Sequence, residues 1–209
     1  MGRASARRRD GHRTRDLARQ AASYLDDASA REAFARWIRA YYRLSAQTLA
    51  KRDGLAEIDA LTAAECARLA GVANRAPVVC RWMSDLLAAE AKAGRLSEMR
   101  LYAIDGNLSA LNDYLGGAER IAKTPLPFAY AQHIKVFVAL FCFTTPFAIV
   151  DAMGWATPVV SGLLALALFG IDEIGVEIED PFGDDPNDLP LDAIGDGIER
   201  AVAETLAAG

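Results

Sequence analysis

Two apolar runs in the second half of the chain constrain its fold more than any other feature. Between residues 134 and 150 the one charged residue is Lys135, and between residues 156 and 171 there is none. Each run is close to the roughly 17 residues that a helix needs to cross the hydrocarbon of a bilayer. The stretch VFVALFCF at 136–143 has no polar face, and a small soluble domain rarely surrounds a helix completely. The runs therefore indicate a membrane protein.

A polar, turn-prone break at Asp151, Gly154 and Trp155 separates the two runs, and Trp prefers the membrane interface. We therefore predict one transmembrane helical hairpin over residues 126–174. Basic residues lie before or at the edge of the first apolar run, at 120, 123 and 135, and the connecting loop has no Lys or Arg. By the positive-inside rule both termini are expected in the cytoplasm. The alternative is a soluble helical protein that buries the same hairpin in its core.

Residues 15–125 carry the charges and are predicted to form a cytosolic helical region. Thr62 and Glu65 have the spacing of a capping box, Ser29 is a candidate N-cap, and a further helix is expected from near Pro77 to Gly94. Apolar residues then recur three and four apart in a stripe that predicts a helix ending at residues 116–117: Leu101, Ile104, Leu108, Leu111 and Leu115. No segment shows strand alternation, so the fold class is all-α.

The two ends of the chain differ in charge. Residues 1–14 hold a cluster of arginines without apolar periodicity and are predicted to be a basic mobile tail. Residues 175–209 are predicted to be an acidic cytosolic C-terminal segment with a terminal helix, whose carboxylates form a solvated turn rather than a calcium site. The net charge of -5 argues against nucleic acid as a partner.

The sequence does not predict an enzyme. Its two histidines, His12 and His133, do not complete a catalytic set, and phosphate-binding glycine loops are absent, so no cofactor and no metal site is expected. His133 is a candidate pH-sensitive residue at the membrane edge, because imidazole titrates near neutral pH. Its alternative role is that of a structural interfacial histidine.

Several longer motifs point to one family. They are ERIAKTPLPFAY at 119–130, GWATP at 154–158, GVEIEDPFG at 175–183 and NDLPL at 187–191, with RTRDLARQ at 13–20 and DGNLSALNDYLGG at 105–117 upstream. In this order and spacing the sequence resembles the bacterial bestrophins, a family of membrane ion channels. The resemblance covers nearly everything after the basic tail.

This resemblance implies a homopentamer around an axial path for inorganic ions, chloride by family analogy. It also implies a pore aperture at Leu126, flanked by Pro125 and Pro127. Prolines donate no backbone hydrogen bond, so these two could hold Leu126 out of a regular helix, and five such side chains would form a narrow, dewetting constriction. In the alternative, Leu126 packs in the core while the prolines mark the bend into the membrane.

The family pattern also implies a further pair of membrane helices before the RTRDLARQ motif, where this sequence reads RASARRRDGH. We therefore expect a chain that is truncated at its start or read from a late or shifted start. The leading hypothesis is a bestrophin-like ion channel subunit, multi-pass in the cell inner (plasma) membrane, with the lipid bilayer as a partner. The alternative is a non-conducting, membrane-anchored helical module that assembles with full-length subunits through its 101–115 face.

Overall fold

The computed structural model describes residues 2–124, 128–177, 181–183 and 188–207, and in these ranges the secondary structure is helical, without strands. The all-α class is therefore confirmed. The chain forms two compact units, one of residues 1–120 with 190–209 and one of residues 121–189. The elements in chain order are α1 (Gly2–Tyr24), α2 (Ala28–Leu49), η1 (Leu55–Glu57), α3 (Ala63–Leu69), α4 (Ala76–Lys92), α5 (Glu98–Lys123), α6 (Phe128–Met153), η2 (Gly154–Ala156), α7 (Thr157–Glu177) and α8 (Leu191–Ala207).

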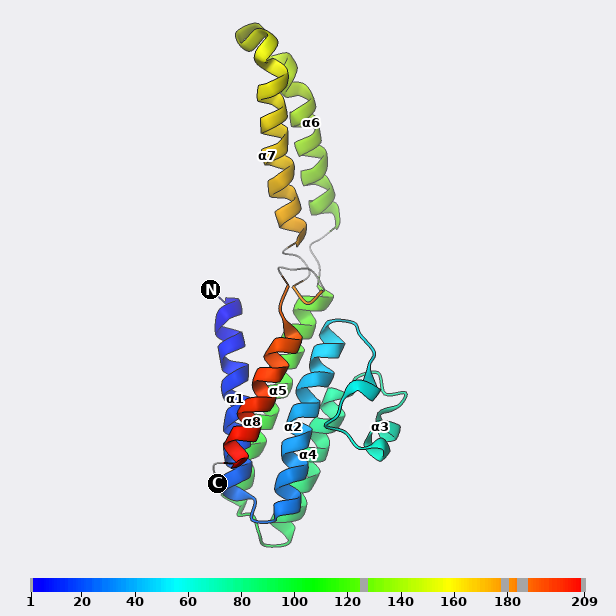
Figure 1. The fold of residues 1–209 in the computed structure, drawn as a ribbon, viewed down its shortest axis with the longest axis vertical. Helices are drawn as coiled ribbons and strands as arrows, with labels where there is room; N and C mark the ends of the chain where they lie inside the picture. Colours follow the sequence, from blue (N-terminus) through cyan, green and yellow to red (C-terminus); the bar gives the residue numbers. More distant parts are fainter. Residues whose placement is uncertain (1, 125–127, 178–180, 184–187, 208–209) are drawn as a thin grey trace. The chain divides into compact units, whose positions relative to one another are not determined.

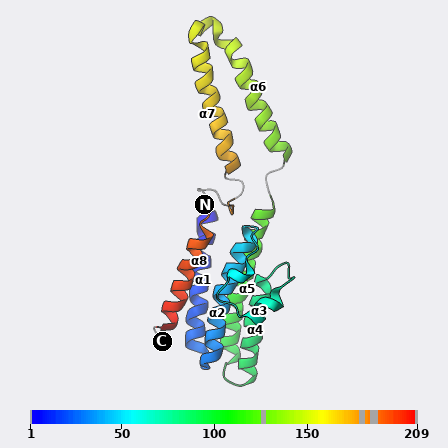
Figure 2. The ribbon, with the colours of Figure 1, turned by 45° about the vertical axis from the view of Figure 1, so that its right-hand side comes forward.

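The first unit is a bundle of long helices. In Figure 1, α1, α4 and α8 run in one direction, and α2 and α5 run in the other. Helix α2 packs against α1, α4 and α8, and α1 also lies along α8. The short helix α3 and its flanking loops lie at one side of the bundle (Figure 1). The second unit contains the α6–α7 hairpin, in which the two helices are antiparallel and meet at η2 (Figure 2).

Helix α2 shows how local sequence positions the core. Asp27 is its N-cap and accepts a hydrogen bond from the Ser29 backbone N–H at 2.9 Å, so the predicted cap at Ser29 is two residues too late. Asp and Ser are both good caps, and the structure decides between them by where the helix turns begin. Phe34, Ile38 and Tyr41 follow at helical spacing and are at most 5% exposed. This stripe faces the centre of the bundle.

Helix α5 confirms most of the predicted apolar stripe. Ile104, Leu108, Leu111 and Leu115 are buried, while Leu101 is half-buried. The predicted end at residues 116–117 is wrong, because α5 continues to Lys123. Each glycine costs a helix only about 1 kcal/mol relative to alanine, and the residues that follow are good helix formers.

The first residues of the chain differ from the predicted mobile tail at 1–14, since α1 begins at Gly2 and runs without a break to Tyr24. Alanine and arginine, which dominate this segment, have high helix propensity, so the helix can extend without an apolar stripe. The anchored part of α1 begins further on, where Leu17, Ala18 and Ala21 are fully buried. Asn107 of α5 also donates to Gln20 at 2.9 Å.

The last helix belongs to the bundle. The sequence analysis set residues 175–209 apart as one segment, whereas the structure groups residues 190–209 with the first unit. Ile198 and Val202 of α8 are 7% and 1% exposed. Their i, i+4 spacing gives α8 an apolar stripe that is buried against α1 and α2. The chain therefore leaves the bundle after α5 and rejoins it with α8.

Candidate functional site

The candidate site is the apolar hairpin of α6, η2 and α7. One continuous helical stretch, Gln132–Gly175, is long and apolar enough to cross a membrane, and its apolar window contains no buried residue. Its largest exposed side chains project from both helices and are 64–73% exposed: Phe137, Phe143, Phe147, Leu163, Leu166 and Ile171. An apolar surface of this kind needs a cover other than water. The soluble alternative expected these side chains to be buried in the chain's own core, and they are not.

Threonine hydroxyls inside the hairpin are satisfied by its own backbone, whereas the buried Ser161 hydroxyl of α7 has no partner among the described residues. The Thr144 hydroxyl donates to the Leu140 carbonyl at 2.9 Å, and the Thr145 hydroxyl donates to the Phe141 carbonyl at 2.7 Å. Such bonds matter in lipid, where no water is present to pair with a hydroxyl. Pro146 lies within α6, which continues through it. The hairpin thus carries little polar surface of its own into the hydrocarbon.

The turn at the tip of the hairpin is built on Gly154. Its φ of 52° is in the left-handed region, which glycine adopts without a steric penalty. The Thr157 hydroxyl donates to the Gly154 carbonyl at 2.6 Å at the start of α7. Trp155 is 94% exposed at this tip, where an amphipathic ring would meet a membrane interface. The predicted break between the two apolar runs is confirmed.

The structure does not test the residues predicted for the pore. Pro125, Leu126 and Pro127 lie outside the described residues, so the aperture stays a prediction. His133 lies near the start of α6 and is exposed. Residues 178–180 and 184–187 of the acidic segment that was weighed for calcium also lie outside the described part of the chain. These site predictions are therefore not tested by the structure.

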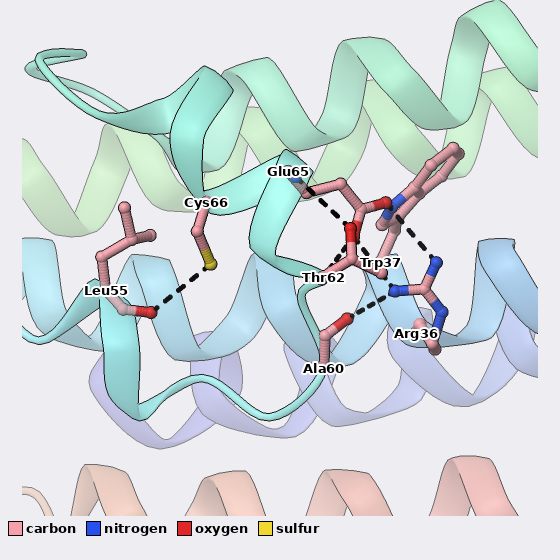
Figure 3. Close-up of polar contacts among 7 residues, drawn as sticks. All are labelled: Arg36, Trp37, Leu55, Ala60, Thr62, Glu65 and Cys66. Atoms are coloured by element: carbon pink, nitrogen blue, oxygen red, sulfur yellow. Dashed lines mark hydrogen bonds and ion pairs between the residues drawn. The ribbon is translucent and has the colours of Figure 1, made fainter.

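The Glu65 cluster, which consists of the Glu65 carboxylate and its donors Arg36, Trp37 and Thr62, connects α3 to α2 (Figure 3). Glu65 accepts hydrogen bonds from Arg36 at 3.1 Å, from the Trp37 indole at 2.6 Å and from the Thr62 backbone N–H at 2.7 Å. Burial raises the pKa of Glu65, but the hydrogen bonds from Arg36, Thr62 and Trp37 outweigh it and hold the pKa at about 2. The predicted capping box is confirmed. Its carboxylate also forms an ion pair that sequence spacing could not reveal.

A second cluster, which we call the α2–α8 ion-pair cluster, consists of Arg43, Asp192, Asp196 and Glu199. The Arg43 guanidinium donates to Asp196 at 2.6 Å and to Glu199 at 2.8 Å, and Asp192 lies 3.9 Å away. The hydrogen bond to Glu199 raises the pKa of Arg43, ahead of the opposing effect of partial burial. About 150 residues separate these partners in sequence, so the sequence analysis missed them. This cluster ties α8 to the bundle.

These features define a class of protein, a helical bundle that carries one apolar hairpin suited to a bilayer. A family model described as "Bacterial/Fungal Bestrophin protein" matches residues 11–204. The chain therefore belongs to the bacterial and fungal bestrophin family, as its motifs indicated. This match extends over both units of the structure.

Curated relatives agree with this assignment. A voltage-dependent anion channel-forming protein of Nostoc sp. is 45% identical over 130 residues, which are 62% of this chain and 42% of the relative. One from Mesorhizobium japonicum is 33% identical over 92% of this chain and 62% of the relative. The voltage-dependent anion channel-forming protein YneE of Escherichia coli is 35% identical over 89% of this chain and 62% of its own length. The chain thus spans less than two thirds of each of these relatives.

A solved structure matches both the fold and its order of elements. A bacterial bestrophin homologue from Klebsiella pneumoniae superposes with a TM-score of 0.92 at 29% identity, covering 98% of this chain and 77% of that one. A mutant of that homologue gives a TM-score of 0.90 at 28% identity, covering 96% of this chain and 76% of the mutant chain. Both the bundle and the hairpin are therefore features of this family's architecture.

Proposed function

We propose that this chain acts as part of an anion-conducting membrane channel subunit. The observation that carries the proposal is the hairpin, whose apolar side chains are exposed on both helices in a chain of the bestrophin family. The relatives from Nostoc and Escherichia coli are both named as voltage-dependent anion channel-forming proteins. Chloride is the simplest inorganic anion to test.

The proposed assembly is a homopentamer in the inner membrane, with both termini cytoplasmic. The orientation is supported by Arg120, Lys123 and Lys135, which precede or begin α6, and by the absence of Lys and Arg from 136–177. A tag at each terminus should be digested by protease in inside-out vesicles and protected in right-side-out vesicles. Digestion of either tag from the outside would refute the orientation.

Leu126 is proposed as the pore aperture, with Pro125 and Pro127 holding it outside a regular helix. Five leucine side chains around one axis would exclude water from a narrow passage, so shortening them should raise conductance or relax selectivity. We expect L126A to change the current in planar bilayers. Ile121→Ala, which removes a nearby apolar side chain that is 47% exposed, is the matched control. Equal currents for both variants and the parent would refute the assignment of the pore aperture to Leu126.

His133 is proposed as a pH-sensitive residue at the membrane edge. It is exposed near the start of α6, two residues before Lys135, where the apolar stretch begins. The expected result is a pH dependence of chloride flux between about pH 5 and 8 that H133Q abolishes. An unchanged pH profile in H133Q would leave a structural role for this residue.

The decisive experiment is chloride efflux from liposomes that contain the purified chain. Its oligomeric state is measured in the detergent used for purification. A pentamer that releases chloride supports the proposal. A pentamer without flux would refute conduction by this chain. If the non-conducting chain co-purifies with a tagged full-length relative, it is instead a membrane-anchored module that assembles with complete subunits.

A further inference from the structure

A polar cleft lies within the first unit, between the second half of α2, the loop from residue 52 to 60 and the start of α8. It encloses a cavity of about 350 Å³, within the range of about 300–1,000 Å³ that small-molecule sites occupy. We call it the α2–α8 cleft, and its principal polar lining consists of Arg39, Arg43, Gln47, Glu57, Asp59 and Asp192. Two neighbouring segments and the distant helix α8 thus line one cleft.

Several charges in the cleft already have partners. Arg43 is held by Asp196 and Glu199, as described above. Arg52 pairs with Asp192 at 3.2 Å. Asp53, which also lines the cleft, pairs with Arg75 at 2.6 Å. These groups form the wall, and they are not the ones that a ligand would have to satisfy.

Two half-buried side chains in the same cleft keep polar atoms unsatisfied. Arg39 forms no hydrogen bond or ion pair within the described residues, and its Nε is fully buried. The Gln47 amide donates to the Gly54 carbonyl at 2.9 Å, but its Oε1 is buried without a partner in the part of the chain described here. A buried donor or acceptor without a partner costs about 1–3 kcal/mol. Both side chains line the cleft, so rotation of either would turn its unsatisfied atom toward a ligand.

The rim of the cleft adds negative charge. Glu57 and Asp59 are exposed, and neither carboxylate has an ion pair among the described residues. Simple anions would meet repulsion from these two carboxylates, while divalent cations would meet repulsion from Arg39. A ligand that carries both signs of charge can place each charge beside an opposite one in this cleft.

We propose that the α2–α8 cleft binds a small zwitterion of the free amino acid class. The ligand's carboxylate accepts hydrogen bonds from the Arg39 guanidinium, a pairing for which arginine is well shaped. Its ammonium donates to Gln47 Oε1, and Glu57 and Asp59 favour the positive charge. This site is separate from the hairpin, so its occupancy does not depend on whether the chain conducts.

The test is ligand binding to the full chain in detergent, followed by thermal unfolding and by calorimetric titration. The probes are L-alanine, L-serine and L-glutamine, each with its N-acetyl derivative, which lacks the ammonium, and its amide, which lacks the carboxylate. We expect at least one free amino acid to raise the Tm, and both of its derivatives to bind at least tenfold more weakly. Absence of any shift at millimolar amino acid would overturn the proposal.

Substitutions of Arg39 and Gln47 test whether the amino acid binds in the α2–α8 cleft. R39Q removes the cation and Q47L removes the acceptor, and each should weaken binding at least tenfold. The matched control is R81Q, because Arg81 is exposed and lies outside the cleft. R39K retains the charge and should restore part of the affinity, while circular dichroism without ligand verifies that each variant is folded. Equal binding by R39Q and the parent, or equal binding of the N-acetyl derivative, would refute the zwitterion site.

Discussion

The Glu65 cluster gives the most quantitative prediction of the structure. The carboxylate is 12% exposed and pairs with Arg36, which is 25% exposed. Its pKa falls from an ordinary value near 4.5 to about 2, which corresponds to about 3 kcal/mol of stability at neutral pH. Breaking a buried ion pair by removing one partner costs about 3–5 kcal/mol, so the two estimates agree at the lower end of that range.

The perturbation is Glu65→Gln. A glutamine can still accept from one donor through its single oxygen, but its NH₂ would face another donor, either Arg36 or the Trp37 indole, and Arg36 would lose its counter-charge. We expect the free energy of unfolding to fall by about 3 kcal/mol. Urea titration of the full chain in detergent, followed by circular dichroism, measures this change. Glu204→Gln is the matched control, because Glu204 is exposed on α8.

The pH dependence of stability is a second readout of the same interaction. Because the folded-state pKa of Glu65 is depressed, the unfolded chain binds more protons between about pH 2 and 4.5, and stability rises with pH in that window. The contribution is fully present above about pH 5 and is lost as the pH falls toward 2. E65Q should lack this component, and E204Q should retain it. Identical pH profiles for E65Q and the parent would refute the assigned cause.

Two glycine pairs test the remaining contacts. A Cβ at Gly195 would lie 2.9 Å from the Arg43 guanidinium, so G195A should lose about 1–2 kcal/mol relative to G197A, where no atom lies within 4 Å, in thermal unfolding. Equal stability of the two variants would mean that the α2–α8 ion-pair cluster adjusts freely. At the hairpin tip, G154A should cost about 1–2 kcal/mol because its φ is 52°, whereas G162A in α7 should cost nothing, as measured by unfolding in mixed micelles. If G154A is as stable as the parent, the turn must adopt another conformation in the variant.

Local and periodic features were predictable from the sequence. The α5 stripe, the capping box of α3 and the break at Gly154 each depend on residues within a few positions of one another, and all three are confirmed. The apolar runs of the hairpin were equally predictable, because lipid exposure requires every face of the helix to be apolar. Motif order then indicated the family.

Long-range partners were not predictable. Nothing in the spacing of Arg43 indicates that its partners lie on α8, because a charge on a helix surface is equally compatible with solvent. The unsatisfied Arg39 in the α2–α8 cleft was missed for the same reason. The helix at residues 2–14 was missed because its sequence has no apolar stripe, and propensity alone is a weak indicator. The aperture residues remain untested, since they lie outside the described residues.

The return of α8 to the bundle has a consequence for synthesis. Helix α1 is made first, yet part of its apolar surface is covered by a helix that emerges from the ribosome after both membrane helices. Its partner α8 can dock only after the α6–α7 hairpin has been synthesised. Completion of the bundle is therefore delayed until the hairpin has been made, and a nascent chain that ends within the hairpin would display an open, chaperone-accessible seam along α1.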